Sequence, residues 1–174
     1  MSEPPGQLIT PTPRHLSQMV ALHAATLAWH HRTHPAIFRP EAPDRAMHKH
    51  FRRYLAFWPR LRRQTRWALG WEVEGLLRAY VLFTAGVIRE TPLHHGRLAF
   101  HVNDIAVHPD FHGHGLARRL LAEVKARAAD SPARGEVHVE VWHGNAVSER
   151  LFQAAGFRPL FQRFACGLED ADGA

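Results

Sequence analysis

The chain has 174 residues, 45% of them hydrophobic, with one cysteine and a formal net charge of +6. This length fits a single domain with a substantial core, and a lone Cys166 excludes an internal disulfide. The most apolar stretch, residues 76–88, is too short to cross a membrane and contains Arg78. Because the N-terminus also lacks a secretion signal, we expect a soluble cytoplasmic protein.

Two helices are predicted in the first third of the chain, after a short strand at residues 9–12. Thr12 and Pro13 are typical of a helix start, an N-cap residue followed by proline at the first helical position. Residues at helical spacing then predict an amphipathic helix over 13–29, and the stripe consists of Leu16, Met19, Val20, His23 and Leu27. A second helix is predicted over 44–58, ended by Pro59.

The middle of the chain reads as strands. Runs at 67–73 and 76–88 are separated by Glu74-Gly75, which predicts a tight hairpin turn. A third long strand is predicted at 98–107.

A helix at about 114–129, a strand at 137–142, a helix at about 146–155 and two final strands between 157 and 168 complete the prediction. The element order indicates an α+β fold. We expect one mixed, mostly antiparallel sheet of roughly six or seven strands, flanked by about four helices.

A glycine-rich turn joins the strand at 98–107 to the helix that follows. Such a turn directs several free backbone N–H groups at one point, and the helix dipole adds partial positive charge there. Gly113 and Gly115 leave room for a ligand to approach the backbone, and Arg118 adds a cation. The result suits a pyrophosphate. An ordinary strand-to-helix turn explains the same glycines, so this segment alone does not distinguish a phosphate-binding loop from a structural turn.

The motifs of two known phosphate-binding loops do not fit the turn, because no GK[S/T] follows and the third glycine of G-x-G-x-x-G is missing. His112, Gly115 and Ala117 instead match the spacing of motif A of the GNAT superfamily, [Q/R]-x-x-G-x-[G/A], with histidine at the first position. Residues 145–157, NAVSERLFQAAGF, resemble motif B of the same superfamily. The chain therefore resembles the GNAT N-acetyltransferases, firmly over residues 67–160 and loosely before them.

This resemblance implies a single domain over 1–174, with acceptor-wall helices at about 13–58 and a coenzyme-binding core at about 67–160. It implies that the strands at 98–107 and 137–142 splay apart, so that the pantetheine arm of acetyl-CoA lies between them. The coenzyme contacts implied are Ile105, Val107, His112, Gly113, His114, Gly115, Leu116, Ala117, Arg118, Asn145 and Phe152.

The resemblance also implies direct transfer of the acetyl group from acetyl-CoA to an amine. Phe152 stands where relatives carry a tyrosine that acts as general acid, and phenylalanine cannot donate a proton. For the base, relatives often carry a glutamate two or four residues before the position of Ile105, on the same strand face. This chain has Asn103 and His101 there, and asparagine cannot act as a base. Histidine can act as a base near neutral pH. His101 is therefore the first catalytic candidate, with a pocket-shaping role as its alternative. Asp104, expected on the opposite face, is the second, with a structural hydrogen bond as its alternative.

The acceptor is expected to be a small-molecule or peptide amine. The resemblance implies that the first two helices and the loop between them wall its site, through Trp29, His30, His31, His34, Phe38 and Trp58. Eight Lys or Arg residues and no acidic residue lie between Arg45 and Arg66, which argues against a polyamine. No metal is expected, because the 15 histidines match no zinc spacing. Two other interpretations stay open: a non-catalytic acyl-CoA-binding module, favoured by Phe152, and a nucleic-acid-associated protein that uses residues 45–66. Many relatives are dimers, so a homodimer stays open as well.

Overall fold

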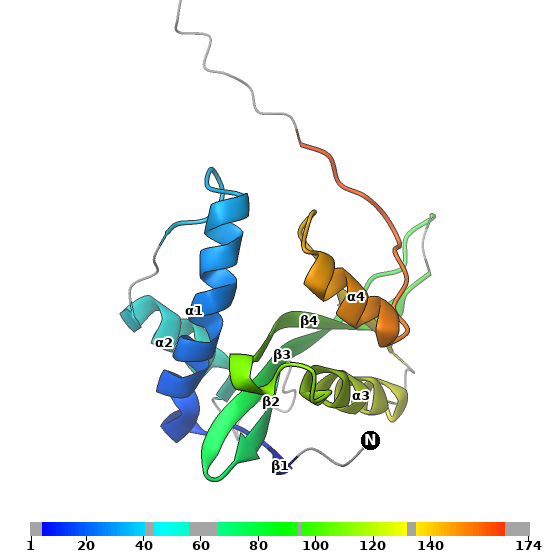
Figure 1. The fold of residues 1–174 in the computed structure, drawn as a ribbon. Helices are drawn as coiled ribbons and strands as arrows, with labels where there is room; N and C mark the ends of the chain where they lie inside the picture. Colours follow the sequence, from blue (N-terminus) through cyan, green and yellow to red (C-terminus); the bar gives the residue numbers. More distant parts are fainter. Residues whose placement is uncertain (1–4, 41–43, 56–65, 94, 132–134, 166–174) are drawn as a thin grey trace, which may run out of the picture.

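The computed structural model describes residues 5–40, 44–55, 66–93, 95–131 and 135–165 (Figure 1). The elements are β1 (Gln7–Ile9), η1 (Pro13–His15), α1 (Leu16–Thr33), α2 (Asp44–Leu55), β2 (Arg66–Val73), β3 (Leu76–Ile88), β4 (Arg97–Val107), η2 (Pro109–Phe111), α3 (Leu116–Ala129), β5 (Glu136–Val139) and α4 (Ala146–Ala154). The strands form one sheet in the order β1-β2-β3-β4-β5. Neighbours are antiparallel except β4 and β5, which are parallel.

The predicted α+β architecture with a mixed sheet is confirmed, but the strand count was too high. The described sheet has five strands. Residues 157–165 form no regular secondary structure, and the rest of the predicted final pair lies outside the described residues. The large apolar side chains of this segment, Leu160, Phe161 and Phe164, are exposed, so no buried face holds it against the sheet.

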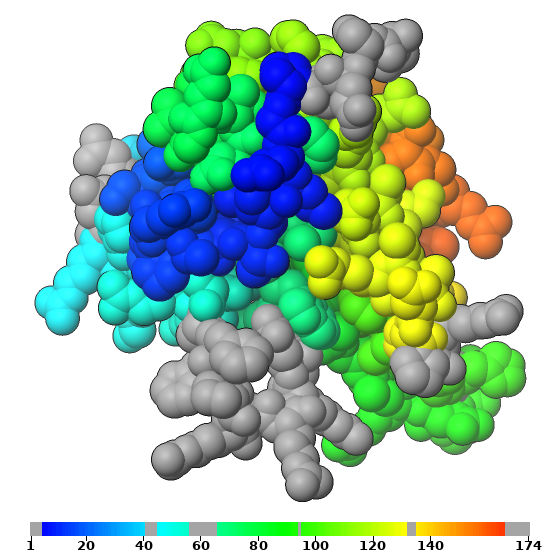
Figure 2. Space-filling model, turned by 90° about the horizontal axis from the view of Figure 1, so that it is seen from below, coloured from blue at the N-terminus to red at the C-terminus, as the bar shows by residue number. Residues whose placement is uncertain are grey.

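Helices cover both faces of the sheet. On one face, α1 and α2 pack on Tyr80 and Leu82 of β3; on the other, α3 and α4 pack on Val81 and Phe83. Figure 2 shows the same division from below, with α1 and α2 in blue and cyan and α3 in yellow. The middle of β3, residues 79–83, is buried on both faces, and there the sequence is a continuous apolar run that lacks alternation.

The turn between β2 and β3 has the predicted hairpin form. Glu74 and Gly75 both have positive φ, at 51° and 76°. A two-residue turn with two positive φ angles matches the right-handed twist of the strands it joins.

A bulge in β4 changes which side chains share a face. Asp104 pairs with Leu82 and Val102 pairs with Phe83, so that the intervening Asn103 has no partner on β3. Val102 and Ile105 therefore both pack toward α3 although they are three residues apart. Simple alternation, which placed His101 with Ile105 and opposite Asp104, is wrong here. His101 and Asp104 share the face on which α1 and α2 lie.

No helix within the described ranges is long and apolar enough to span a membrane.

We predict that Leu120→Ala lowers the free energy of unfolding by about 2–5 kcal/mol, because it leaves a cavity in the core between α3 and the sheet. Leu120 is 0% exposed, whereas Leu93, in the loop between β3 and β4, is 86% exposed. Leu93→Ala is the matched control and should change stability by less than about 0.5 kcal/mol. Urea unfolding of both variants measures the difference, and equal losses would contradict the packing described.

Candidate active site

The glycine-rich turn has the geometry of an anion-binding loop. Gly113 and Gly115 have φ of 80° and 78°, and Gly115 is the N-cap of α3. The first intrahelical bond of α3 runs from Arg119 N to Gly115 O at 3.1 Å, so the N–H groups before Arg119 have no acceptor within the helix. No heavy atom lies within 4 Å of a Cβ built on either glycine. Open space in front of free N–H groups at a helix start fits a pyrophosphate.

His112 and His114, both predicted to contact the coenzyme, have side chains that hydrogen-bond to backbone carbonyls of the turn. The Nε2 atom of His112 lies 3.0 Å from Val107 O, and the Nδ1 atom of His114 lies 3.1 Å from His112 O. Both rings therefore brace the loop between β4 and α3. Leu116 is buried in the core, whereas Ala117 and Arg118 face outward to differing degrees.

Beside this loop, β4 and β5 separate. Their pairing covers only Ala99–Val102 and ends at Val102 with Val139, while β4 continues to Val107. The edge of β4 that carries Ile105 and Val107 thus has no β5 partner, as the splayed-strand prediction requires. A hydrogen-bonding strand edge is free to receive an extended ligand there.

The predicted motif B residues occupy α4 and its start. Asn145 is the N-cap, and its Oδ1 accepts a hydrogen bond from Ser148 N at 3.1 Å. Phe152 is 5% exposed and packs edge-on against Phe157 at 5.4 Å between ring centres. Its ring is therefore part of the core under α4.

Asp104, the second candidate for the base, belongs to a buried polar cluster that also contains His23 of α1 and Tyr80 of β3. The Asp104 Oδ2 atom lies 2.8 Å from His23 Nδ1 and accepts a hydrogen bond from the Tyr80 hydroxyl at 2.6 Å. Burial raises the pKa of Tyr80 well above 10.0, and the Asp104 carboxylate raises it further. Tyr80 therefore keeps its proton at neutral pH. His101 lies apart from this cluster, paired across the sheet with Thr84 and His138.

Sequence reasoning missed His23 and Tyr80 as site residues. His23 was assigned to the apolar stripe of the first helix, and Tyr80 was set aside because it does not stand at the motif B position. The available signal was a histidine on the same helix face as the core residues Leu16 and Met19. A polar side chain on a buried stripe needs a partner, and here that partner is Asp104.

Aromatic rings from the end of α1 and the loop after it meet a ring from the segment between β5 and α4. His30 stacks on Phe38 at 4.6 Å between ring centres, and Trp142, which follows β5, lies 4.9 Å from Phe38 and 5.1 Å from His34. The Nδ1 atom of His31 lies 2.8 Å from Phe38 O. Trp58, also expected in this wall, lies outside the described residues.

Burial lowers the pKa of His30 below 6.5, so the neutral form of His30 predominates at pH 7. Arg52 and Arg53 of the basic segment are exposed on α2, while Arg62 and Arg63 lie outside the described residues. Within the described ranges, no group of three or more His, Cys, Asp or Glu side chains could hold a metal ion.

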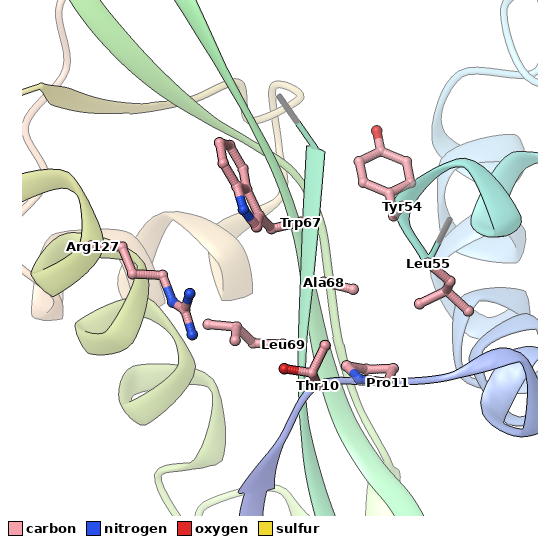
Figure 3. Close-up of a pocket in the computed structure, with 8 residues that line it drawn as sticks. All are labelled: Thr10, Pro11, Tyr54, Leu55, Trp67, Ala68, Leu69 and Arg127. Carbon is pink, nitrogen blue, oxygen red and sulfur yellow. The ribbon is translucent and has the colours of Figure 1, made fainter. Parts of the chain in front are cut away.

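A hollow of about 250 Å³ opens elsewhere, beside the edge of β2 (Figure 3). Its lining consists of Thr10, Pro11, Tyr54, Leu55, Trp67, Ala68, Leu69 and Arg127. It forms where β1, which pairs only with residues 70–72, leaves the start of β2 uncovered. None of the predicted coenzyme or catalytic residues lines it, so we do not assign the active site there.

Comparison with known proteins agrees with this geometry. A model of the acetyltransferase (GNAT) family matches residues 25–157, which is more than half of the chain. The chain belongs to the GNAT acetyltransferase family. No curated protein sequence matches it significantly.

Solved structures share the fold. A mutant of the BH1408 protein from Bacillus halodurans has a TM-score of 0.78 at 16% identity, covering 94% of this chain and 99% of its own. The aminoglycoside acetyltransferase AAC(6')-Iy, bound to a CoA-containing bisubstrate analogue, has a TM-score of 0.64 at 19% identity, covering 92% and 98%. A ribosomal-protein-alanine N-acetyltransferase from Brucella melitensis has a TM-score of 0.61 at 20% identity, covering 94% and 99%.

We predict that Gly115→Asp abolishes binding of acetyl-CoA, because it places a carboxylate where the pyrophosphate would lie. Gly115→Asn is the matched control, since Asn has the same size and tolerates positive φ about as well. Thermal unfolding with acetyl-CoA measures the effect: at a hundredfold excess over Kd, bound ligand adds about 2.7 kcal/mol. The Asn variant should retain more of that stabilisation than the Asp variant. Undiminished binding by Gly115→Asp would remove the basis of the pyrophosphate assignment.

Proposed function

We propose that this chain transfers an acetyl group from acetyl-CoA to the amine of a small-molecule or peptide acceptor, directly and without a covalent enzyme intermediate. The observation that carries the proposal is the position of the His23–Asp104 pair. It lies beside β4 just beyond the last residue that pairs with β5. An acid–base pair thereby stands at the start of the strand edge that we assign to the acyl donor.

The coenzyme would be held by the chain's own backbone. The N–H groups of Gly113 and of residues 115–118 would bind the pyrophosphate, while the N–H of His114 bonds Phe111 O at 3.4 Å. The free edge at Ile105 and Val107 would bond the pantetheine arm. Support for this assignment comes from the positive φ glycines, the open space in front of them and the family match to residues 25–157.

His23 acts as the general base in this proposal. Ionised Asp104 is an acceptor only, so the hydrogen on Nδ1 of His23 faces it and Nε2 keeps its lone pair. That nitrogen takes the proton of the amine as the amine nitrogen bonds to the thioester carbon. Tyr80 is a positioning residue, because its hydroxyl holds the carboxylate of Asp104 at 2.6 Å. The pair thus follows the logic of a histidine oriented by a carboxylate.

The departing sulfur needs little help. The carbon–sulfur bond breaks to release a thiolate, and thiols have a pKa of about 8.5, so the thiolate is a moderately stable leaving group in water. It then takes a proton from solvent. The loss of the motif B hydroxyl at Phe152 therefore removes one acid without preventing turnover.

We predict that His23→Asn lowers kcat by about a hundredfold or more, the usual contribution of a positioned base. The Asn amide can still donate to Asp104, but it has no nitrogen that can accept the proton. Acetyl-CoA binding and the melting temperature should change little. A thiol-release assay with a panel of amines measures kcat.

His101→Asn is the matched control, because His101 was the other candidate base and lies on the same sheet face. It should keep most of the activity. A large loss in His101→Asn with none in His23→Asn would reverse the assignment. If the wild-type chain binds acetyl-CoA but acetylates none of the amines, the non-catalytic module is the correct interpretation.

A further inference from the structure

Two histidines lie on one face of α1, and a third follows at the end of the helix. His23 and His30 are separated by seven residues, a spacing that returns to the same side of a helix, and His34 is the C-cap residue of α1. His23 contacts Asp104, and His30 lies about 10 Å further along the helix axis. The row therefore runs from the proposed base toward the outer end of the site.

The outer end of this row is enclosed by rings from both sides of the site. His30 packs face to face on Phe38 with an interplanar angle of 21°, and Trp142 packs against the rings of His30, His34 and Phe38. Trp142 comes from the segment between β5 and α4, whereas the other rings belong to α1 and the loop after it. An acceptor that passes these four rings to reach His23 must therefore be small.

Two nitrogens in this enclosure are unsatisfied. The Nδ1 atom of His30 and the Nε2 atom of His34 are buried and have no hydrogen-bond partner within the described part of the chain. Buried polar atoms are nearly always paired, so an unpaired set of two needs an explanation. Each nitrogen can carry the ring hydrogen and donate it, because the tautomer adapts to the partner.

The net charge of residues 16–55 disfavours acceptors that carry a second ammonium group. Residues 16–55 contain six Lys or Arg residues and two acidic ones, Glu41 and Asp44. Asp104 is already bonded to His23 and Tyr80. The six cations are exposed, and their combined field disfavours a second ammonium group on the acceptor and attracts an anion.

We propose that the acceptor is a small amine that also carries a carboxylate, with its amine at His23 and its carboxylate bound by His30 and His34. Two donor nitrogens match two carboxylate oxygens. This inference rests on the proposed function and narrows its acceptor.

Three amines of matched length test it: 6-aminohexanoate, hexylamine and 1,6-diaminohexane, each with acetyl-CoA. We expect kcat/KM for 6-aminohexanoate to exceed that for hexylamine about tenfold or more, as hydrogen bonds to a charged group contribute. The diamine should be the poorest of the three. Equal values for the three amines, or a preference for the diamine, would overturn the inference.

The variants His30→Phe and His34→Phe test whether these two rings cause the preference for 6-aminohexanoate, because phenylalanine keeps a ring in the enclosure and removes the nitrogens. Each should lower the ratio of kcat/KM between 6-aminohexanoate and hexylamine about tenfold. His95→Phe, in the exposed loop between β3 and β4, is the control and should leave the ratio unchanged. An unchanged ratio in both enclosure variants would contradict the assignment of the carboxylate to these rings.

A binding experiment separates this inference from the proposed function. Calorimetric titration of 6-aminohexanoate into the CoA-saturated chain should give saturable binding that is weakened in His34→Phe. If no amine is acetylated, the proposed function fails, but the titration still shows whether the chain binds the carboxylate of 6-aminohexanoate. Absence of binding in the titration overturns the inference, whether or not hexylamine is acetylated.

Discussion

The site depends on one constraint in the sheet: β4 bonds β3 along its length but bonds β5 only over Ala99–Val102. The free edge beyond Val102 ends in the turn whose two glycines have positive φ. One strand thus leads from an unpaired edge to an unpaired helix start, and in the proposed complex both would offer backbone donors to the same extended ligand. Side chains contribute mainly by bracing the loop, as His112 does on Val107 O.

The bulge at Asn103 turns the carboxylate of Asp104 toward α1, beside that free edge. Without it, alternation would turn Asp104 toward α3, and its carboxylate would be buried among apolar side chains at a high cost. With it, Asp104 faces α1 and gains two hydrogen-bond partners, His23 and Tyr80. A bulge next to an active site that redirects a side chain in this way is a recurrent device in β-sheets. The same change of register moves His101 away from the face of Ile105.

Much of the fold followed from local patterns in the sequence. The strand at 76–88 has the bounds of β3, and the glycine turn and the N-cap at Asn145 behave as their residue types require. The prediction of strands after residue 157 was wrong because an apolar run forms a strand only if it can pair with a strand edge and bury one face. His23 and Tyr80 could not be assigned because their partner is 81 and 24 residues away, respectively, and a single-residue bulge decides whether they meet.

Hydrogen exchange of the backbone amides, read by mass spectrometry with and without acetyl-CoA, tests the central claim most directly. The account predicts that acetyl-CoA slows exchange at residues 103–118, where the free edge of β4 and the start of α3 would both acquire ligand acceptors. Exchange at the start of β2, beside the hollow, should not change. Protection at residues 66–69 with none at 103–118 would place the coenzyme in the wrong part of the molecule for this account and contradict it.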